Sequence, residues 1–127
     1  MRLVVPTTLV CAVLATPVLA DDAADLAAAK ALIENAHVSA ASDLSMWCGA
    51  AMTLVAAATK DSEAAKSSAA DASATAFFTQ ASASLKTDGV KEEDMSALST
   101  AYMTVANAQL VAQSEAPSHS TDDCVSN

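Results

Sequence analysis

Two cysteines are the side chains best suited to covalent chemistry once the first twenty residues are set aside. Cys48 and Cys124 stand 76 positions apart, and neither belongs to a Cys-x-x-Cys pair or has a base close to it in the sequence. In an exported chain, two such cysteines most simply form one disulfide, for which the chain-entropy model gives roughly 4.5 kcal/mol. Two free thiols and a catalytic cysteine are the competing interpretations. We predict a structural disulfide between Cys48 and Cys124.

Metal binding is the chemistry that the histidines and methionines could add. His37 and His119 are the only histidines, whereas a structural zinc site needs four ligands and a catalytic one usually three. Met46, Cys48 and Met52 carry soft sulfur ligands. However, positions 46 and 52 lie about 240° apart on a helix and cannot converge on one ion. We predict no metal site and no other cofactor, with the methionines filling the core.

Sequence motifs for catalysis are absent. The chain has no Cys-x-x-Cys-His haem attachment, no glycine-rich phosphate loop and no Gly-x-Ser-x-Gly elbow. Its fifteen acidic residues are spread along exposed faces and helix starts, which is typical of solubility and capping rather than of a paired general acid and base. We expect that the protein is not an enzyme.

Residues 1–20 have the three parts of a secretory signal peptide. Arg2 supplies the positive start, Leu3 to Leu14 form an apolar stretch, and Val18-Leu19-Ala20 is a small-residue cleavage site. The apolar stretch is shorter than the roughly 20 residues that a membrane-spanning helix needs. We expect cleavage after Ala20 and a periplasmic or secreted protein.

The remaining 107 residues are strongly acidic. They include five lysines, no arginine and all fifteen acids, which gives a net charge of −10. Such a surface repels phosphate backbones and anionic lipid headgroups. No later run reads as long and apolar enough to span a bilayer. We therefore expect no nucleic-acid partner and no stable membrane insertion after signal cleavage.

Alanine determines the expected fold class. Of the 107 residues after position 20, 29 are alanine, and the only glycines there are Gly49 and Gly89. Alanine is the strongest helix former and lets helices approach closely, but each alanine buries little apolar area. We predict an all-α fold that is tightly packed yet short of hydrophobic stabilisation.

The stretch from Asp43 to Lys60 is the expected centre of this fold. It holds Trp47, the only tryptophan, which shares a helical stripe with Leu54, and a second stripe beside it contains Cys48. Apolar residues also recur at helical spacing in a later helical pattern, residues 90–114. We expect the structural core to include Trp47, Met52, Leu54, Leu98, Tyr102 and Val105.

Three helical patterns follow one another, over residues 23–59, 62–86 and 90–114. Gly89 follows the second pattern, where a left-handed glycine cap is expected. We predict an antiparallel three-helix bundle core as a single domain over residues 21–116. A polar tail, residues 117–127, would be pinned back onto the Trp47 helix through Cys124.

The first helical pattern is too long for such a bundle. It keeps its phase from residue 23 to 59, and it is about 18 Å longer than either of the others at 1.5 Å per residue. Its first apolar residues would then project uncovered, which soluble proteins seldom allow. Either the chain breaks at Ser39–Asp43 and folds back as a short fourth helix, or residues 23–40 pair with a second subunit in a homodimer. Serine and aspartate, which are good caps, favour the break.

The segment Ser45-Met46-Trp47-Cys48-Gly49-Ala50-Ala51-Met52, with a second cysteine near the C-terminus, carries a family resemblance. The chain resembles the small, single-disulfide, all-helical proteins that Gram-negative bacteria export to the periplasm, most of which have no assigned function. The HdeA-type acid chaperones are also all-α, disulfide-linked and about this size, with a tryptophan close to the first cysteine. The resemblance implies a periplasmic helical protein of similar plan.

Two functions are compatible with these features. By elimination, we expect an exported, non-enzymatic helical protein that acts as a protein-binding or structural module, its partner an unknown protein. The alternative is an acid-stress periplasmic chaperone. In that case the fifteen carboxylates would lose their charge at about pH 2–4 and loosen a weakly stabilised core, which would then be exposed.

Overall fold

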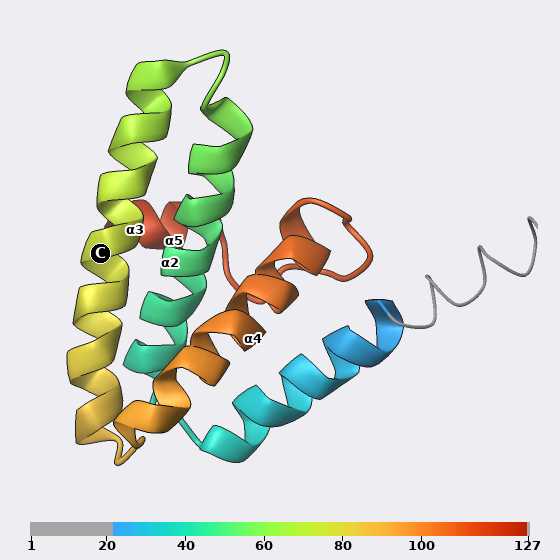
Figure 1. Cartoon of the computed structure of the whole chain (residues 1–127), viewed down its shortest axis with the longest axis vertical. Helices are drawn as coiled ribbons and strands as arrows, with labels where there is room; N and C mark the ends of the chain where they lie inside the picture. Colours follow the sequence, from blue (N-terminus) through green and yellow to red (C-terminus); the bar gives the residue numbers. More distant parts are fainter. Residues whose placement is uncertain (1–21, 127) are drawn as a thin grey trace, which may run out of the picture.

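The computed structural model describes residues 22–126, and this part of the chain is helical without a strand (Figure 1). The predicted all-α fold class is confirmed. The predicted signal peptide, residues 1–20, lies outside the described residues. A first helix covers residues 22–36 and is followed by α2 (Ala40–Thr59), α3 (Ala64–Thr87), α4 (Glu92–Leu110) and α5 (Thr121–Ser126).

The long first pattern is broken at residues 37–39. His37 has a left-handed backbone, with φ of 50°. Ser39 is the N-cap of α2, and its hydroxyl oxygen accepts a hydrogen bond from the backbone N–H of Ser42 at 3.3 Å. Ser42 and Asp43, which belong to the range Ser39–Asp43 where the break was expected, lie inside α2. The break therefore comes at the start of the expected window, and the first helix folds back.

The helices α2 and α3 form an antiparallel hairpin, side by side along their length (Figure 1). The buried residues of α3 lie on one face, because Ala70, Ala74, Ala81 and Leu85 recur at helical spacing. Small side chains on this face allow the two helices to approach closely. At Gly49 the Phe78 ring of α3 takes the place of a side chain, since a Cβ atom there would lie 2.9 Å from the ring.

Gly89 ends α3 with the predicted left-handed cap. Its φ is 89°, and its N–H donates to the Lys86 carbonyl at 3.1 Å. The Val90 N–H donates to the Leu85 carbonyl at 2.9 Å. These two bonds are those of a Schellman motif, which satisfies carbonyls that the helix leaves free. The chain then turns directly into α4.

The arrangement of α4 differs from that of the predicted three-helix bundle. It packs across α2, has few contacts with α3, and diverges from α3 after the connecting turn (Figure 1). Its other face is covered by the antiparallel first helix, where Ala29 is buried against Ala101 and Val105. The fold is therefore two antiparallel helix pairs, α2 with α3 and the first helix with α4, joined where α4 crosses α2.

The C-terminal tail is more structured than its polar sequence suggested. The helix α4 ends at Leu110, four residues before the predicted end, and Gln113 adopts a left-handed turn with φ of 53°. This turn ends the helix before Pro117 can do so. Residues 111–120 then lead to α5, a six-residue helix that packs against α2.

The hydrophobic core surrounds the first half of α2. Trp47, Leu98, Tyr102 and Val105 are buried, with Trp47 only 1% exposed. The predicted core residues Met52 and Leu54 are only half-buried and pack against the edge of this core. The difference arises because α4 crosses the first half of α2, so that the second half is covered mainly by α3.

By length and composition alone, α2 could cross a membrane, which corrects the expectation that no run after residue 20 is long and apolar enough to do so. The reason is its alanine content, since Asp43 is the one charged residue among its twenty. In this structure α2 is instead the helix on which α3, α4 and α5 pack. The composition of α2 is therefore compatible both with a core helix and with a membrane-spanning helix.

Candidate functional site

The disulfide is the covalent centre of the molecule. Cys48 and Cys124 are bonded, with their Cα atoms 5.5 Å apart, and both residues are buried. The predicted pairing is present, so these cysteines are joined rather than free in this structure. The bond fastens α5 to the middle of α2 and closes a loop of 76 positions.

The side chain of Trp47 is held by a glutamine from α4. The indole N–H donates to Gln109 Oε1 at 2.7 Å, and both residues are buried. The same oxygen lies 3.3 Å from the backbone nitrogen and from the hydroxyl of Ser118, both of which donate to it. Gln109 therefore links three segments: α2, α4 and the tail.

A second polar contact joins the same three segments. Asp43 on α2 accepts a hydrogen bond from the Tyr102 hydroxyl on α4, and its other oxygen lies 2.7 Å from His119 Nε2 in the tail. Burial, followed by the contact with the Asp43 carboxylate, raises the pKa of the Tyr102 phenol well above its usual range. The His119 ring also packs edge-on against Trp47, with centroids 5.5 Å apart.

These side chains form a tail-anchoring cluster, which we define as Asp43, Trp47, Tyr102, Gln109 and His119. A carboxylate paired with an imidazole could transfer protons, but acyl transfer also needs a nucleophile. The serines beside His119 are engaged elsewhere, because Ser118 donates to Gln109 and Ser120 Oγ accepts from the Asp122 N–H. The cluster is therefore suited to holding the tail in place.

A serine–aspartate cluster connects the ends of α2 and α3. Asp88 Oδ2 accepts hydrogen bonds from the Ser39 N–H and the Ser39 hydroxyl, each at 3.0 Å, and from the Ser42 hydroxyl at 2.6 Å. The Ser84 hydroxyl lies 2.6 Å from that of Ser42, which is fully buried. The hydrogen bond from Ser42, followed by the one from the Ser39 backbone, lowers the pKa of Asp88.

The candidate soft-metal ligands do not come together. Met46 is buried in the main core and Met52 packs at its edge. His37 is exposed at the break before α2, and His119 pairs with Asp43. Within residues 22–126 there is no group of three or more histidine, cysteine, aspartate or glutamate side chains that could hold a metal ion.

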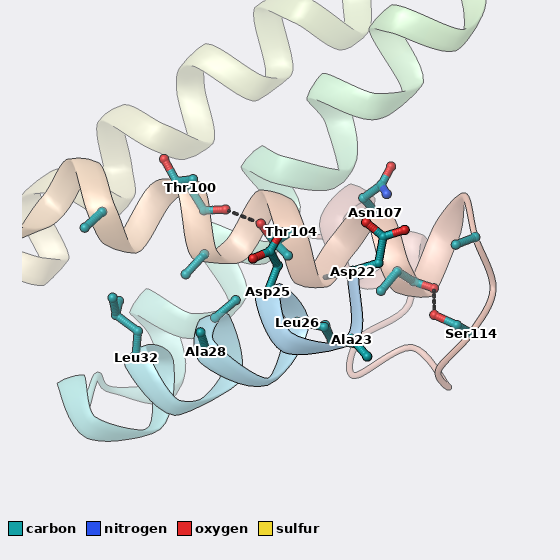
Figure 2. A pocket seen from close by; sticks show the side chains of 15 residues that line it. Asp22, Ala23, Asp25, Leu26, Ala28, Leu32, Thr100, Thr104, Asn107 and Ser114 are labelled. Carbon is teal, nitrogen blue, oxygen red and sulfur yellow. Dashed lines mark hydrogen bonds between the residues drawn. The ribbon is translucent and has the colours of Figure 1, made fainter. Parts of the chain in front are cut away.

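An open groove of about 770 Å³ runs between the first helix and α4 (Figure 2). Leu26 and Leu32 line it from the first helix, and Leu32 is 40% exposed. Alanines and threonines line it from α4. Side chains this small cannot fill the space between the two helices, so a groove remains. The carboxylates Asp22 and Asp25 also border it (Figure 2). A second groove, of about 670 Å³, lies between the end of the first helix and residues 88–98.

Several residues of these clusters were not predicted as site residues. Gln109 carried a signal, because it is a polar residue on the apolar face of a helix. Asp43 was expected only as a cap near the break, and His119, in the polar tail, was weighed only as a metal ligand. Their partners lie 59 to 76 positions away, a separation at which helical periodicity carries no information.

Comparison with known proteins gives no match: no protein-family model, no curated protein and no solved structure matches this chain. The resemblance to exported single-disulfide helical proteins rests on the residues around Trp47 and Cys48, and it stays a prediction.

Proposed function

We propose that the protein is an exported, non-enzymatic helical module that binds a partner protein in the groove between residues 22–36 and α4. The groove itself carries this proposal. Its volume of about 770 Å³ can accept side chains of a partner, and most of the residues that line it are small and apolar. A partially exposed leucine in such a lining is typical of a surface that buries an apolar segment of a partner.

Charge defines the kind of partner that the groove favours. Asp22 and Asp25 border it, and the whole chain has a formal net charge of −9. An acidic surface of this kind attracts cationic partners and raises their association rate. The proposed partner segment is therefore amphipathic, with apolar side chains that enter the groove and lysine or arginine at its edge.

The tail-anchoring cluster supports a non-enzymatic role. Its hydrogen-bonding groups bond to one another across α2, α4 and the tail. Every buried side-chain nitrogen and oxygen in residues 22–125 has a hydrogen-bond partner. A buried disulfide is also typical of an oxidising compartment such as the periplasm.

Site-specific photo-crosslinking in whole cells tests the groove. A photoreactive residue replaces Thr100, which is exposed in the groove, and the control replaces Thr87, which is exposed on α3. Both threonines donate to the carbonyl four residues earlier, so the two changes are locally alike. We expect one partner to be crosslinked from position 100 and not from 87, and to be lost when Ala97→Trp fills the groove. Equal crosslinking from both positions contradicts the proposal.

The acid-chaperone alternative is favoured by one separate observation. Two carboxylates tie the first helix and its connection to the rest of the molecule: Glu115 pairs with Lys30 at 2.9 Å, and Asp88 binds Ser39. The hydrogen bond from Lys30 lowers the pKa of Glu115. Protonation of both groups in acid would weaken these ties and favour exposure of the apolar face of α4.

Light scattering of an aggregating client protein separates the two functions. The assay compares the protein at about pH 2.5 and at neutral pH, with a client that aggregates under both conditions. Suppression of aggregation at low pH only supports the chaperone. No suppression at either pH contradicts it and leaves the binding module.

A further inference from the structure

We propose that two copies of this protein exchange their first helices. In the exchanged dimer, residues 22–36 of one copy pack on α4 of the other, and residues 37–39 become helical. Each copy then has one continuous helix over residues 22–59. The two arrangements considered from the sequence, a folded-back helix and a homodimer through residues 23–40, become two states of one equilibrium.

The connection before α2 is the hinge of this exchange. His37 has φ of 50°, a left-handed conformation that is unfavourable for a residue with a side chain. Its side chain is exposed and has no hydrogen bond or ion pair within the described residues, and its backbone N–H donates one hydrogen bond, to the Glu34 carbonyl at 3.3 Å. A helical conformation at residues 37–39 removes the strain. Short, strained hinges favour exchange of this kind.

The sequence is already in register for the continuous helix. Leu26 and Ile33 in the first helix and Leu44 and Trp47 in α2 keep one helical phase across the break. Neither glycine nor proline occurs at residues 37–39, so the segment can adopt a helical backbone. A helix over residues 22–59 is about 57 Å long. Its first half then points away from its own α4 and needs another surface to cover it.

The receiving surface on α4 fits the same helix from a second copy. Ala29 packs on Ala101 and Val105, and Lys30 pairs with Glu115 at 2.9 Å. Because the two chains are identical, the exchanged dimer restores each of these contacts between copies. What the exchange loses is the Ser39 cap of α2 and its bonds to Asp88. The balance between hinge strain and this cap sets the equilibrium constant. Because the exchange joins two copies, the fraction of dimer also depends on protein concentration.

Mixed crosslinking detects the exchange directly. One chain carries Ala29→Cys and a second, differently tagged chain carries Ala101→Cys, and the two are mixed at high concentration and treated with a short bismaleimide. Positions 29 and 101 of different chains meet only when the first helix crosses between copies. We expect a crosslinked heterodimer in the mixture and none with either variant alone. A dimer that forms without this crosslink uses another surface, and that result overturns the proposal.

Two substitutions at His37 test the hinge, with light scattering after size exclusion as the readout. Glycine accepts the left-handed conformation and is a poor helix former, so His37→Gly should lower the dimerisation constant by about tenfold or more. Alanine is the better helix former, so His37→Ala should raise it. Ser39→Ala, which removes the cap, should act in the same direction as His37→Ala. A protein that stays monomeric in all variants at millimolar concentration overturns the proposal, as does a dimer that is equally stable with glycine and alanine.

Discussion

Gln109 is the residue on which the attachment of the tail depends most directly. Its side-chain oxygen accepts from the Trp47 indole at 2.7 Å and from Ser118. A buried N–H that loses its only acceptor retains the cost of leaving water. A polar residue on the apolar face of α4 is thus explained by a buried partner on another helix.

Gln109→Leu should therefore lower the free energy of unfolding by about 1–3 kcal/mol, because the indole N–H is left buried and unpaired. Urea unfolding followed by Trp47 fluorescence measures this change. The matched control is Gln80→Leu, at an exposed position on α3, which should change stability by less than about 0.5 kcal/mol. Equal effects at the two positions contradict the role given to Gln109.

Gly49 lies in the middle of α2, where glycine weakens a helix. Its replacement by alanine should stabilise the helix by about 1 kcal/mol if nothing opposes it. The Phe78 ring opposes it, because the new Cβ atom would lie 2.9 Å from that ring. Packing of the Phe78 ring against α2, and not helix propensity, accounts for glycine at this position.

A double-mutant cycle separates these two effects. We expect Gly49→Ala to destabilise the protein when Phe78 is present, and to stabilise it by about 1 kcal/mol in a Phe78→Ala background. Denaturant unfolding of the four proteins gives the coupling energy. A Gly49→Ala substitution that is equally stabilising in both backgrounds shows that the ring does not restrict this position.

At the scale of elements, Asp88 connects the end of α3 to the start of α2. Three hydrogen bonds from Ser39 and Ser42 favour its charged form and lower its pKa in the folded protein. A carboxyl group with a lowered folded-state pKa contributes stability above its unfolded pKa, and this contribution is lost as the pH falls through the folded pKa. The stabilisation from the Asp88 charge is thus present at neutral pH and lost in strong acid.

Asp88→Asn should reduce the loss of stability that the protein shows below about pH 4, since one carboxylate no longer takes up a proton on unfolding. Urea unfolding midpoints between about pH 6 and pH 2 measure this dependence. Asp71→Asn is a suitable control, because Asp71 is exposed on the same helix. An acid dependence in Asp88→Asn identical to that of the parent protein excludes a role for this carboxylate.

At the scale of the whole molecule, the disulfide offsets the small hydrophobic stabilisation of a core built largely from alanine. The Cys48–Cys124 bond joins the middle of α2 to the last helix across 76 positions. In the unfolded chain this cross-link removes conformations that the free chain would have. A fold with little buried apolar area per residue depends on such a constraint more than one with a leucine core.

Replacing Cys48 and Cys124 together by alanine should lower the free energy of unfolding by about 2–5 kcal/mol. The tail should also become mobile, because its remaining polar contacts, those of His119 with Asp43 and of Ser118 with Gln109, are only partly buried. Urea unfolding gives the first effect, and hydrogen exchange of residues 118–126 gives the second. Unchanged exchange in the double variant shows that the polar contacts alone hold the tail.

Processing of the chain is also testable at this scale. The exported protein should begin at Asp21 and should be two hydrogens lighter than its reduced form, because one disulfide is closed. Intact-mass spectrometry with and without reductant measures both properties. A titre near two free thiols per chain, without reductant, contradicts the bond.

The sequence alone predicts the helical class, the glycine cap after α3 and the pairing of the two cysteines that follow residue 20. It also placed a break near Ser39. Each of these follows from local chemistry or from simple counting: alanine favours helix, Gly89 accepts a left-handed φ, and the two cysteines that follow residue 20 have one way to pair with each other.

Which helix faces meet could not be predicted from the sequence and is known from the three-dimensional structure. Helical periodicity shows that a face is apolar, but alanine faces resemble one another, so the sequence did not reveal that α4 leaves α3 and pairs with the first helix. The polar contacts depend on that choice. Because α4 crosses the first half of α2, Trp47 bonds to Gln109, 62 positions away, and Asp43 bonds to Tyr102, 59 positions away.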